Sequence, residues 1–599
     1  MTFTPPPAFT TRPTLSGTFG MSASTHWLAT ATAQAVLERG GNAFDASVAA
    51  AFVLHVVEPH LNGPGGDLVG IFQTADASAP AVLMGQGPAP AGATIEHYRA
   101  EGLDLVPGSG ALAAAVPGAV DAWLLLLRDH GTWELAEVLA YAIGYARDGH
   151  PLTPQAAATI ARVAELFRDE WTTSAELWMP GGMPPRPGEV VRNPAYAEVL
   201  DGLVHASCTV RDDGPVGRAA RIDAARREWR TGRVAQEAAA FAAKPHRHSA
   251  GGRHAGVITA DDFAAFEAGY EPAVTRAFRG RTIAKAGAWT QGPALLQALA
   301  LLEPFDDDLL DPSSEAGAHL LLEAQKLALA DRDAWFGDAD VDLGALLDED
   351  YLAERRSLIG AAASEDFRPG SIGGRAPFRP PLRTEYAGVE ASTGEPTVAR
   401  TGETRGDTCH LDVVDRWGNI VSATPSGGWL QSSPTIPGLG FCLGTRLQMT
   451  WLEPGTPSSL VPGRRPRTTL TPTLALRDGT PEFAIGTPGG DQQDQWQLPV
   501  LLRMIVGGYS AQEAIDSPSL HTTAMPESFW PRTWTPAGAV VEDRLGEGVI
   551  AGLERRGHRV TRAGDWSLGR VSAVGRRSAD GVLWAAANPR GMQGYAAGR

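Results

Sequence analysis

The feature that most constrains this chain is an abrupt change in character at Thr408, far from either end of its 599 residues. Residues 360–407 are rich in Gly, Pro, Ser, Thr and Arg, and they show no apolar periodicity. From Thr408 the chain reads TCHLDVVD, a pattern typical of a strand. A loop that presents one peptide bond, followed by a strand that holds the next residue rigidly, is what a chain requires to cut itself before a threonine. By itself the pattern also fits a Thr that merely begins a hairpin strand.

The residues that follow this strand predict a hairpin. Residues 416–419 read RWGN and indicate a tight turn, because Gly and Asn tolerate the positive φ that such turns require. Residues 420–424 then read as the return strand. Thr408 would therefore stand at the start of a buried hairpin.

Several further motifs lie on both sides of Thr408, and their order is more specific than any one of them. Downstream, the chain reads RPRTTLTPT at 465–473 and GTPGGD at 486–491. Upstream, and near the C-terminus, the motifs are GGNAFDA at 40–46, VVEPH at 56–60, VPGAV at 116–120, GPALLQAL at 292–299, ADRD at 330–333, RGHRV at 556–560 and NPRG at 588–591.

In this order the motifs resemble the gamma-glutamyltranspeptidase family of N-terminal nucleophile hydrolases, and the resemblance covers nearly the whole chain. It implies an α+β fold, a four-layer αββα sandwich built from both products of a self-cleavage. Residues 1–407 would form a helix-rich large subunit that ends in a flexible pre-cleavage segment of about 360–407. Residues 408–599 would form the small catalytic subunit, and the two would together make one structural domain.

The chemistry expected of Thr408 follows from its place at a new N-terminus. A threonine hydroxyl is a weak nucleophile without a base. After cleavage of the Asp407–Thr408 bond, the freed α-amine can serve as that base, since its pKa of about 7.7–8.0 leaves a useful neutral fraction. The same hydroxyl would first attack the carbonyl of Asp407 and later attack a substrate amide, which gives an acyl-enzyme released to water or to an amine.

Two further catalytic roles are implied by the resemblance. The backbone N–H groups of Gly489 and Gly490 would stabilise the tetrahedral oxyanion. Ser426 takes the place of the family's second threonine, whose hydroxyl contacts the amine of the nucleophile. The alternatives are an ordinary turn at residues 487–490 and a turn serine beside Pro425.

The positions that would hold the substrate depart from the family pattern. Where the family has an arginine that binds the substrate carboxylate, the nearest match is Gln86. After Gln448 the family has two acidic residues, the second of which binds the substrate amine, and Trp451 stands at that second place. Arg446 is a substitute anion binder or, alternatively, a surface arginine. The serine pair that touches the carboxylate in the family is here Thr468-Thr469, a milder change.

These departures leave the substrate open. Glutathione or another γ-glutamyl amide is the conventional expectation, and an amide of a different acyl group is the alternative, because a γ-glutamyl group would lose two charged partners. A second alternative moves the cut by one residue and makes Cys409 the nucleophile, although a buried small hydrophobe is the simpler interpretation of that cysteine. A third is an unprocessed homologue that only binds a small amide.

Composition limits the possible partners of the protein and its expected location in the cell. A net charge of −17 argues against nucleic acid as a partner. Three cysteines make no disulfide framework. The first residues lack the apolar core of a secretory signal, and the apolar stretch 48–57 is too short to span a bilayer, so we expect a cytoplasmic protein. We expect no cofactor, metal or membrane, expect the two fragments to stay associated, and leave a homodimer open.

Apolar periodicity also predicts individual elements. The expected helices cover residues 26–39, 43–57, 119–128, 135–147, 218–243 with a break near Thr231-Gly232, 295–302, 318–332, 499–506 and 511–514.

Overall fold

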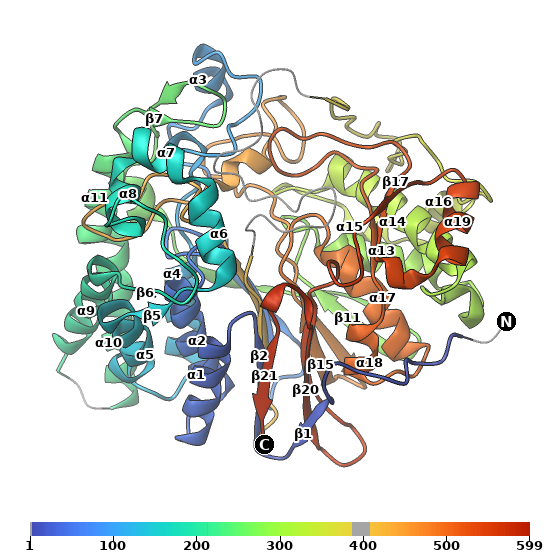
Figure 1. Cartoon of the computed structure of the whole chain (residues 1–599), viewed down its shortest axis with the longest axis horizontal. Helices are drawn as coiled ribbons and strands as arrows, with labels where there is room; N and C mark the ends of the chain where they lie inside the picture. Colours follow the sequence, from blue (N-terminus) through green and yellow to red (C-terminus); the bar gives the residue numbers. More distant parts are fainter. Residues whose placement is uncertain (1–2, 212–213, 386–407) are drawn as a thin grey trace.

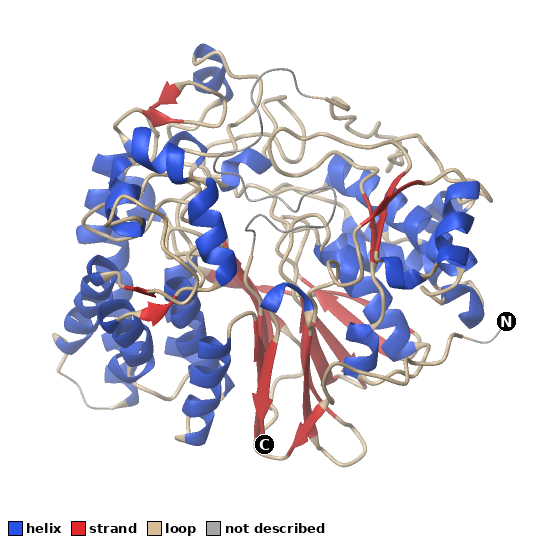
Figure 2. Ribbon diagram, in the orientation of Figure 1, coloured by secondary structure: helices blue, strands red, loops and turns tan. Residues whose placement is uncertain are grey.

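The computed structural model describes residues 3–211, 214–385 and 408–599. Two antiparallel sheets of seven strands each stand face to face at the centre, and helices lie outside both of them (Figures 1 and 2). The first sheet is, in spatial order, β21 (Tyr595–Gly598), β2 (Gly20–Ser24), β12 (Leu411–Asp415), β13 (Ile420–Ser426), β3 (Asp67–Gln73), β4 (Ala81–Gly85) and β9 (Gly269–Pro272). The second is β1 (Leu15–Gly17), β20 (Leu583–Ala587), β19 (Ser572–Arg576), β15 (Thr480–Gly486), β14 (Thr473–Arg477), β11 (Arg281–Lys285) and β10 (Val274–Phe278).

The space between the sheets is an apolar core. Ile71 and Val414 from the first sheet pack in one buried cluster with Leu474 and Val574 from the second. Because side chains alternate along a strand, the neighbouring residue Val413 belongs to a different cluster, on the helical side of the first sheet. Each sheet therefore buries both of its faces.

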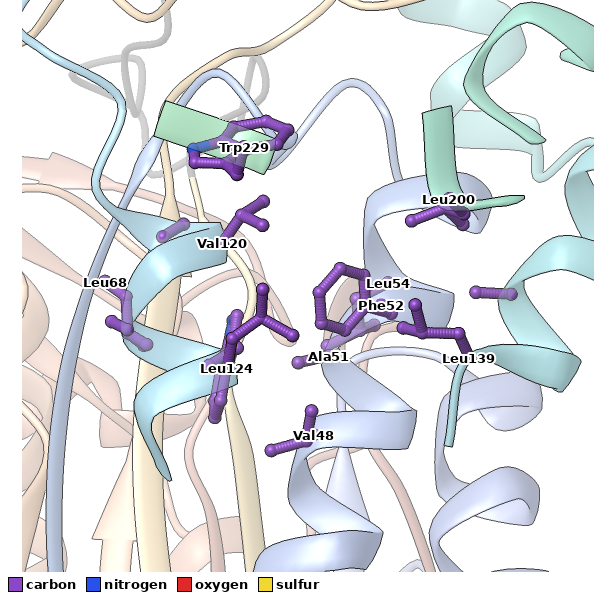
Figure 3. Close-up of a cluster of buried hydrophobic side chains, with 14 of the residues drawn as sticks. Val48, Ala51, Phe52, Leu54, Leu68, Val120, Leu124, Leu139, Leu200 and Trp229 are labelled. Carbon is purple, nitrogen blue, oxygen red and sulfur yellow. The ribbon is translucent and has the colours of Figure 1, made fainter. Parts of the chain in front are cut away.

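Helices cover the outer face of the first sheet in successive layers. Helices α1, α2 and α4 contact its strands, α5 and α10 pack on α2 and α4, and α9, α11 and α12 pack on α5 or α10. Figure 3 shows Leu124 of α4 between Leu68 of the sheet and Phe52 of α2. The helices of this side are α1 (Trp27–Glu38), α2 (Ala43–Val57), α4 (Ala119–His130), α5 (Leu135–Asp148), α9 (Pro194–Cys208), α10 (Pro215–Thr231), α11 (Arg233–Ala242) and α12 (Ala260–Ala265).

The second sheet is covered by a smaller set of helices, which contact β10, β11, β15 and β20 either directly or through one another. They are α13 (Gly292–Leu302), α14 (Glu315–Trp335), α17 (Gln493–Ile505), α18 (Ala511–Asp516) and α19 (Glu547–Arg555). A small sheet of β16 (Leu520–Thr522), β17 (Gly538–Val541) and β18 (Arg559–Arg562) packs beside α14 and α19. The remaining elements are α3 (Ile95–Ala100), α6 (Pro154–Arg162), α7 (Ala164–Asp169), α8 (Thr172–Trp178), α15 (Leu343–Leu346), α16 (Glu349–Arg356), β5 (His150–Pro151), β6 (Val190–Val191), β7 (His246–Arg247) and β8 (Arg253–His254).

Most of the expected helices are confirmed, including the break between α10 and α11 at Gly232. The start of α17 is the clearest error. We expected this helix to begin at Pro499, but it begins at Gln493 and contains the proline. A proline cannot donate to the carbonyl four residues before it. The side-chain amide of Gln325 supplies the missing donor, 3.1 Å from the carbonyl oxygen of Gln495.

Strands from the two sides of Thr408 are interleaved in both sheets. The hairpin β12–β13 begins just after Thr408, yet its outer neighbours β2 and β3 come from the first 73 residues. In the second sheet, β14 and β15 lie between β11 and β19. The part of the chain after Thr408 therefore shares its sheets and its cores with the part before it.

The expected pre-cleavage segment is described only in part. Residues 360–385 form no helix, and Phe367 and Ile372 are buried. The N–H of Gly370 donates to Asp331 of α14 at 2.8 Å. Residues 386–407, which include the expected cleavage residue Asp407, lie outside the described residues.

The three cysteines are free thiols, as expected, with Cys208 exposed and the other two buried. None of the helices in the described ranges is long and apolar enough to cross a membrane.

Candidate active site

Thr408 stands where the hairpin opens. It pairs with Ser426, the last residue of β13, in an antiparallel bridge that continues the register of β12 and β13. Its hydroxyl oxygen lies 3.1 Å from the hydroxyl oxygen of Ser426, and both residues are buried. The N–H of Cys409 donates to the carbonyl of Pro425 at 3.1 Å, which fixes the backbone beside the hydroxyl. The two hydroxyl residues that the sequence indicated are thus brought together.

The next residue, Cys409, lies on the other face of the strand. Its thiol belongs to the cluster under the helices, where it lies 3.0 Å from a carboxylate oxygen of Glu58 and 3.1 Å from the amide of Asn62. Burial raises the pKa of the Glu58 carboxyl.

The glycine loop approaches Thr408 through a carbonyl. The hydroxyl of Thr408 donates to the carbonyl oxygen of Gly489 at 3.3 Å, and the side-chain amide of Gln493 donates to the same oxygen. Because C=O and N–H point in opposite directions across a trans peptide, the N–H of Gly490 points away from the hydroxyl in this conformation. We find no hydrogen bond from the N–H of Gly489 or Gly490 to any described residue. Their role as oxyanion donors stays a prediction.

Both glycines of this loop are required by the backbone. Gly489 has a φ of +133°, which L side chains rarely adopt, and a Cβ on it would come within 3.1 Å of the Trp496 ring. A Cβ on Gly490 would lie 2.7 Å from the ring of Phe529. The loop is therefore pressed between the start of α17 and the segment around Phe529.

Arg446 does not lie on the surface, so that alternative is wrong. The side chain is 3% exposed and forms a two-pronged ion pair with Asp67, with one N–O distance of 2.8 Å. Asp67 lies opposite Ser426 in the sheet, which places this pair beside the hydroxyls. Gln86 is also buried and donates to the carbonyl of Gly87 at 3.1 Å. Burial raises the pKa of Asp67, while Arg446 opposes this rise.

A turn at residues 529–532, which the sequence did not indicate, contacts both Gln448 and Trp451. The N–H of Trp530 donates to the side-chain oxygen of Gln448 at 3.1 Å. The guanidinium of Arg532 donates to the backbone carbonyls of Gln448 and Thr450, at 2.8 and 3.0 Å. The same guanidinium lies 3.9 Å from the centre of the Trp451 ring. Trp451, which replaces an acidic residue of the family, thus lies against a positive charge.

Thr468 and Thr469 are both buried. The hydroxyl of Thr468 accepts a backbone hydrogen bond from Leu470 at 3.3 Å. The hydroxyl of Thr469 has no hydrogen-bond partner within the part of the chain that the structure describes. Since buried hydroxyls are normally paired, Thr469 is the stronger candidate for contact with a ligand.

Only one group of three described residues has the donor atoms of a metal site close together. The ligand atoms of His319, Glu323 and His558 lie within 4.8 Å of one another. The carboxylate of Glu323 already accepts from Lys326 at 2.7 Å and from Arg368 at 2.8 Å. Two cations beside the one anionic ligand disfavour a metal ion there, and none of the predicted site residues belongs to this group.

Comparison with known proteins agrees with the motifs over nearly the full length. The profile of the gamma-glutamyltranspeptidase family matches residues 29–598. The acylase ACY 1 proenzyme of Pseudomonas sp. (strain SE83) is 30% identical over 564 residues, which cover 92% of this chain and 88% of that protein. The oxamate amidohydrolase proenzyme of Klebsiella pneumoniae is 30% identical over 597 residues, which cover 97% of this chain and 98% of that protein.

The fold is shared with a solved structure as well. The structure of LmbA2991HD superposes with a TM-score of 0.92 at 54% identity, and the match covers 99% of this chain and 100% of that one.

Proposed function

We propose a specific reaction for this chain, which belongs to the gamma-glutamyltranspeptidase family and is an enzyme related to acylases and amidohydrolases. Thr408 is the nucleophile of an amidohydrolase or acyltransferase, and the enzyme becomes active by cutting its own chain before this residue. The observation that carries the proposal is the hydroxyl of Thr408, held at the start of a central strand between Ser426 and Gly489. In this proposal the two sheets and their helices form the family's four-layer sandwich.

Self-cleavage is the first reaction. The hydroxyl oxygen of Thr408 attacks the carbonyl carbon of Asp407, and the peptide C–N bond breaks as its nitrogen takes up a proton. The acyl group of Asp407 is then an ester on Thr408, and the α-amine is free. Water cleaves the ester, which leaves a carboxylate on Asp407 and returns the proton to the threonine oxygen. The interleaved strands favour continued association of the two fragments.

The second reaction uses the freed amine. The neutral α-amine takes the proton of the Thr408 hydroxyl while its oxygen attacks the substrate amide, and the proton passes to the departing amine. Water or an amine acceptor then takes the acyl group from the threonine. The hydroxyl of Ser426, 3.1 Å from the nucleophilic oxygen, orients this centre.

Oxyanion stabilisation requires a change in the glycine loop. The carbonyl of Gly489 faces the hydroxyl in the structure, and an oxyanion needs a donor there instead. Rotation of the Gly489–Gly490 peptide would present an N–H to that place, and glycine on both sides keeps such a rotation sterically accessible. Gln493 donates to the carbonyl in its present position and would be released by the rotation.

The substrate proposal is an amide whose acyl group carries no ammonium. Trp451 stands where the family has an acid for the substrate amine, and the guanidinium of Arg532 lies against its ring. A buried cation beside this position repels an ammonium. The names of the two relatives above, an acylase and an oxamate amidohydrolase, are consistent with acyl groups other than γ-glutamyl.

The geometry favours Thr408 over Cys409, because the thiol faces Glu58 on the opposite side of the strand. The test is intact-mass analysis of purified protein, followed by N-terminal sequencing of the smaller fragment. We expect two fragments, and the smaller one should begin with Thr408. A fragment that begins with Cys409, or a chain that stays whole and inactive after long incubation, would contradict the proposal. The cytoplasmic location is a separate proposal, and cell fractionation tests it.

A further inference from the structure

A cluster of five buried charged residues lies beside the glycine loop, and its charges do not balance. Three guanidinium groups, Arg332, Arg467 and Arg532, accompany two carboxylates, Asp333 and Asp491, and none of the five residues is more than 3% exposed. Arg332 pairs with both carboxylates, and Arg467 pairs with Asp333 at 2.9 Å. Arg532 forms no ion pair with any described carboxylate.

The surplus charge is therefore on Arg532. One of its terminal nitrogens donates to two backbone carbonyls, and the plane of the group lies over Trp451. Its other two nitrogens donate no hydrogen bond to any residue that the structure describes. The backbone at Arg532 has a φ of +60°, a conformation of appreciable cost for a residue other than glycine. Strain of this kind persists where the surrounding structure holds a side chain in a required place.

Arg532 is attached to the loop that touches the nucleophile. Its N–H closes a tight turn to the carbonyl of Phe529 at 2.8 Å, and the Phe529 ring presses on Gly490. The carboxylate of Asp491 accepts from the N–H and the hydroxyl of Ser528, at 2.8 and 2.6 Å. The turn that carries Arg532 is thus held against two adjacent residues of the glycine loop, Gly490 and Asp491.

A buried cation without an anion is costly, and a ligand anion removes that cost. Burial and the neighbouring Arg467 lower the pKa of Arg532, as expected for a guanidinium that lacks its counter-ion. By contrast, Arg446 has its own carboxylate, Asp67, and so has no surplus charge to offer. This difference separates two buried arginines that the sequence alone would rank together.

We propose that Arg532 binds a carboxylate on the acyl group of the substrate, an inference that rests on the function proposed above. The substrate class is then a monoamide of a dicarboxylic acid whose acyl part bears no ammonium. The unpartnered hydroxyl of Thr469, two residues after Arg467, is a second donor for the same carboxylate. The acyl side is assigned because the turn of Arg532 packs on Gly490, beside the place of the acyl oxygen.

The first experiment compares substrates on the unaltered enzyme. Matched p-nitroanilides of oxalic, succinic and glutaric acid carry the acyl carboxylate, valeryl-p-nitroanilide carries no charge, and γ-glutamyl-p-nitroanilide adds an ammonium. We expect kcat/KM to be at least about 30-fold higher for the best dicarboxylic donor than for the other two, because the other donors leave the buried guanidinium unpaired or add an ammonium beside it. A preference for valeryl or γ-glutamyl donors would overturn the inference.

The second experiment removes the charge and keeps the shape. Arg532→Gln should lower kcat/KM for the dicarboxylic donor by about 30-fold or more and change the valeryl donor less than about threefold. The matched control is Arg544→Gln, because Arg544 also lies over a tryptophan, at 3.3 Å from the Trp566 ring, and has no contact with the glycine loop. The control should leave both donors unchanged. Equal losses for both donors in Arg532→Gln would mean a purely structural role.

The outcomes separate this inference from the function on which it rests. If the wild-type chain neither cuts itself nor hydrolyses any donor, the proposed function is wrong. If it cuts itself and hydrolyses donors without regard to the acyl carboxylate, only the role of Arg532 is wrong. If kcat/KM depends instead on a carboxylate in the amine part of the substrate, the assignment of Arg532 to the acyl group is also wrong.

Discussion

The two faces of the strand that begins at Thr408 differ more than any other neighbouring surfaces near the site. On the inner face, Thr408 is followed by His410 and Asp412, and the imidazole lies 2.9 Å from the Asp412 carboxylate. On the outer face, Cys409 is followed by Leu411 and Val413, which pack under the helices. From Thr408 to Asp412 the inner face is polar and hydrogen-bonded, and it becomes apolar only at Val414. The outer face is hydrophobic apart from the contacts of Cys409 with Glu58 and Asn62.

The difference shows that two adjacent residues, Thr408 and Cys409, can hold their hydroxyl and thiol groups in very different surroundings. A thiol is intrinsically the better nucleophile, but burial in apolar surroundings disfavours its reactive thiolate form. A hydroxyl gains reactivity only from its surroundings. In the proposed mechanism, position on the strand, rather than the nature of the side chain, therefore decides which residue reacts.

The largest effect should come from exchanging the two roles. Thr408→Ala should remain one chain and lose hydrolysis by a factor on the order of 10⁶, the scale for loss of a hydrolase nucleophile. Cys409→Ala is the matched control and should still be cut, with turnover within about threefold of wild type. Gel electrophoresis and initial rates decide the matter. If the Thr408 variant is still cut, or if only the Cys409 variant fails to be cut, Thr408 is not the nucleophile of self-cleavage.

The next effect concerns the loop that faces the inner side. Gly489→Val should strain the backbone at a φ of +133° and cut turnover by about 10²–10³-fold, the usual result of losing one oxyanion donor. Circular dichroism should confirm that the variant is folded. Near-normal turnover would remove the loop from the mechanism.

A smaller effect is expected at Ser426. Ser426→Ala should lower kcat about fivefold, because one hydrogen bond of about 1 kcal/mol to the reacting group is lost. Ser426→Thr, which keeps the hydroxyl, should retain most of the activity. If both substitutions behave alike, the hydroxyl has no part in the reaction.

The smallest effect is a pH dependence on the outer face. The folded-state pKa of Glu58 is raised by burial, so its protonated form contributes stability below the unfolded pKa, and this contribution is lost as pH rises through the folded pKa. Glu58→Gln copies the neutral form. The melting temperature of this variant relative to wild type should therefore increase from pH 4 to pH 8. A constant difference across this range would mean that Glu58 is ionised in the fold.

Much of this comparison could be predicted from the sequence. Polar and apolar residues alternate from Thr408 to Val413, and alternation with a period of two assigns them to opposite faces. The hairpin and the helices before it were expected from local patterns, since turn residues and periodicity report local structure. The hydroxyl contact with Ser426 was expected only from the family resemblance.

The remainder depends on which distant segments meet. Arg532 contacts Gln448 across 84 positions of the sequence, and Gln325 completes α17 across 170. No local pattern encodes such pairings. For the same reason the sequence could not decide whether Arg446 binds an anion or lies on the surface, because its partner Asp67 lies 379 positions away.

The interleaving of strands from both sides of Thr408 has a kinetic consequence. A chain that is still whole folds in a unimolecular process, at a rate independent of its concentration. Under the proposed cleavage, β12 and β13 would belong to one molecule and their neighbours β2 and β3 to another. Refolding of the cut protein would then be a second-order assembly, slowed by dilution, which favours a maturation in which the sheets form first and the cut follows.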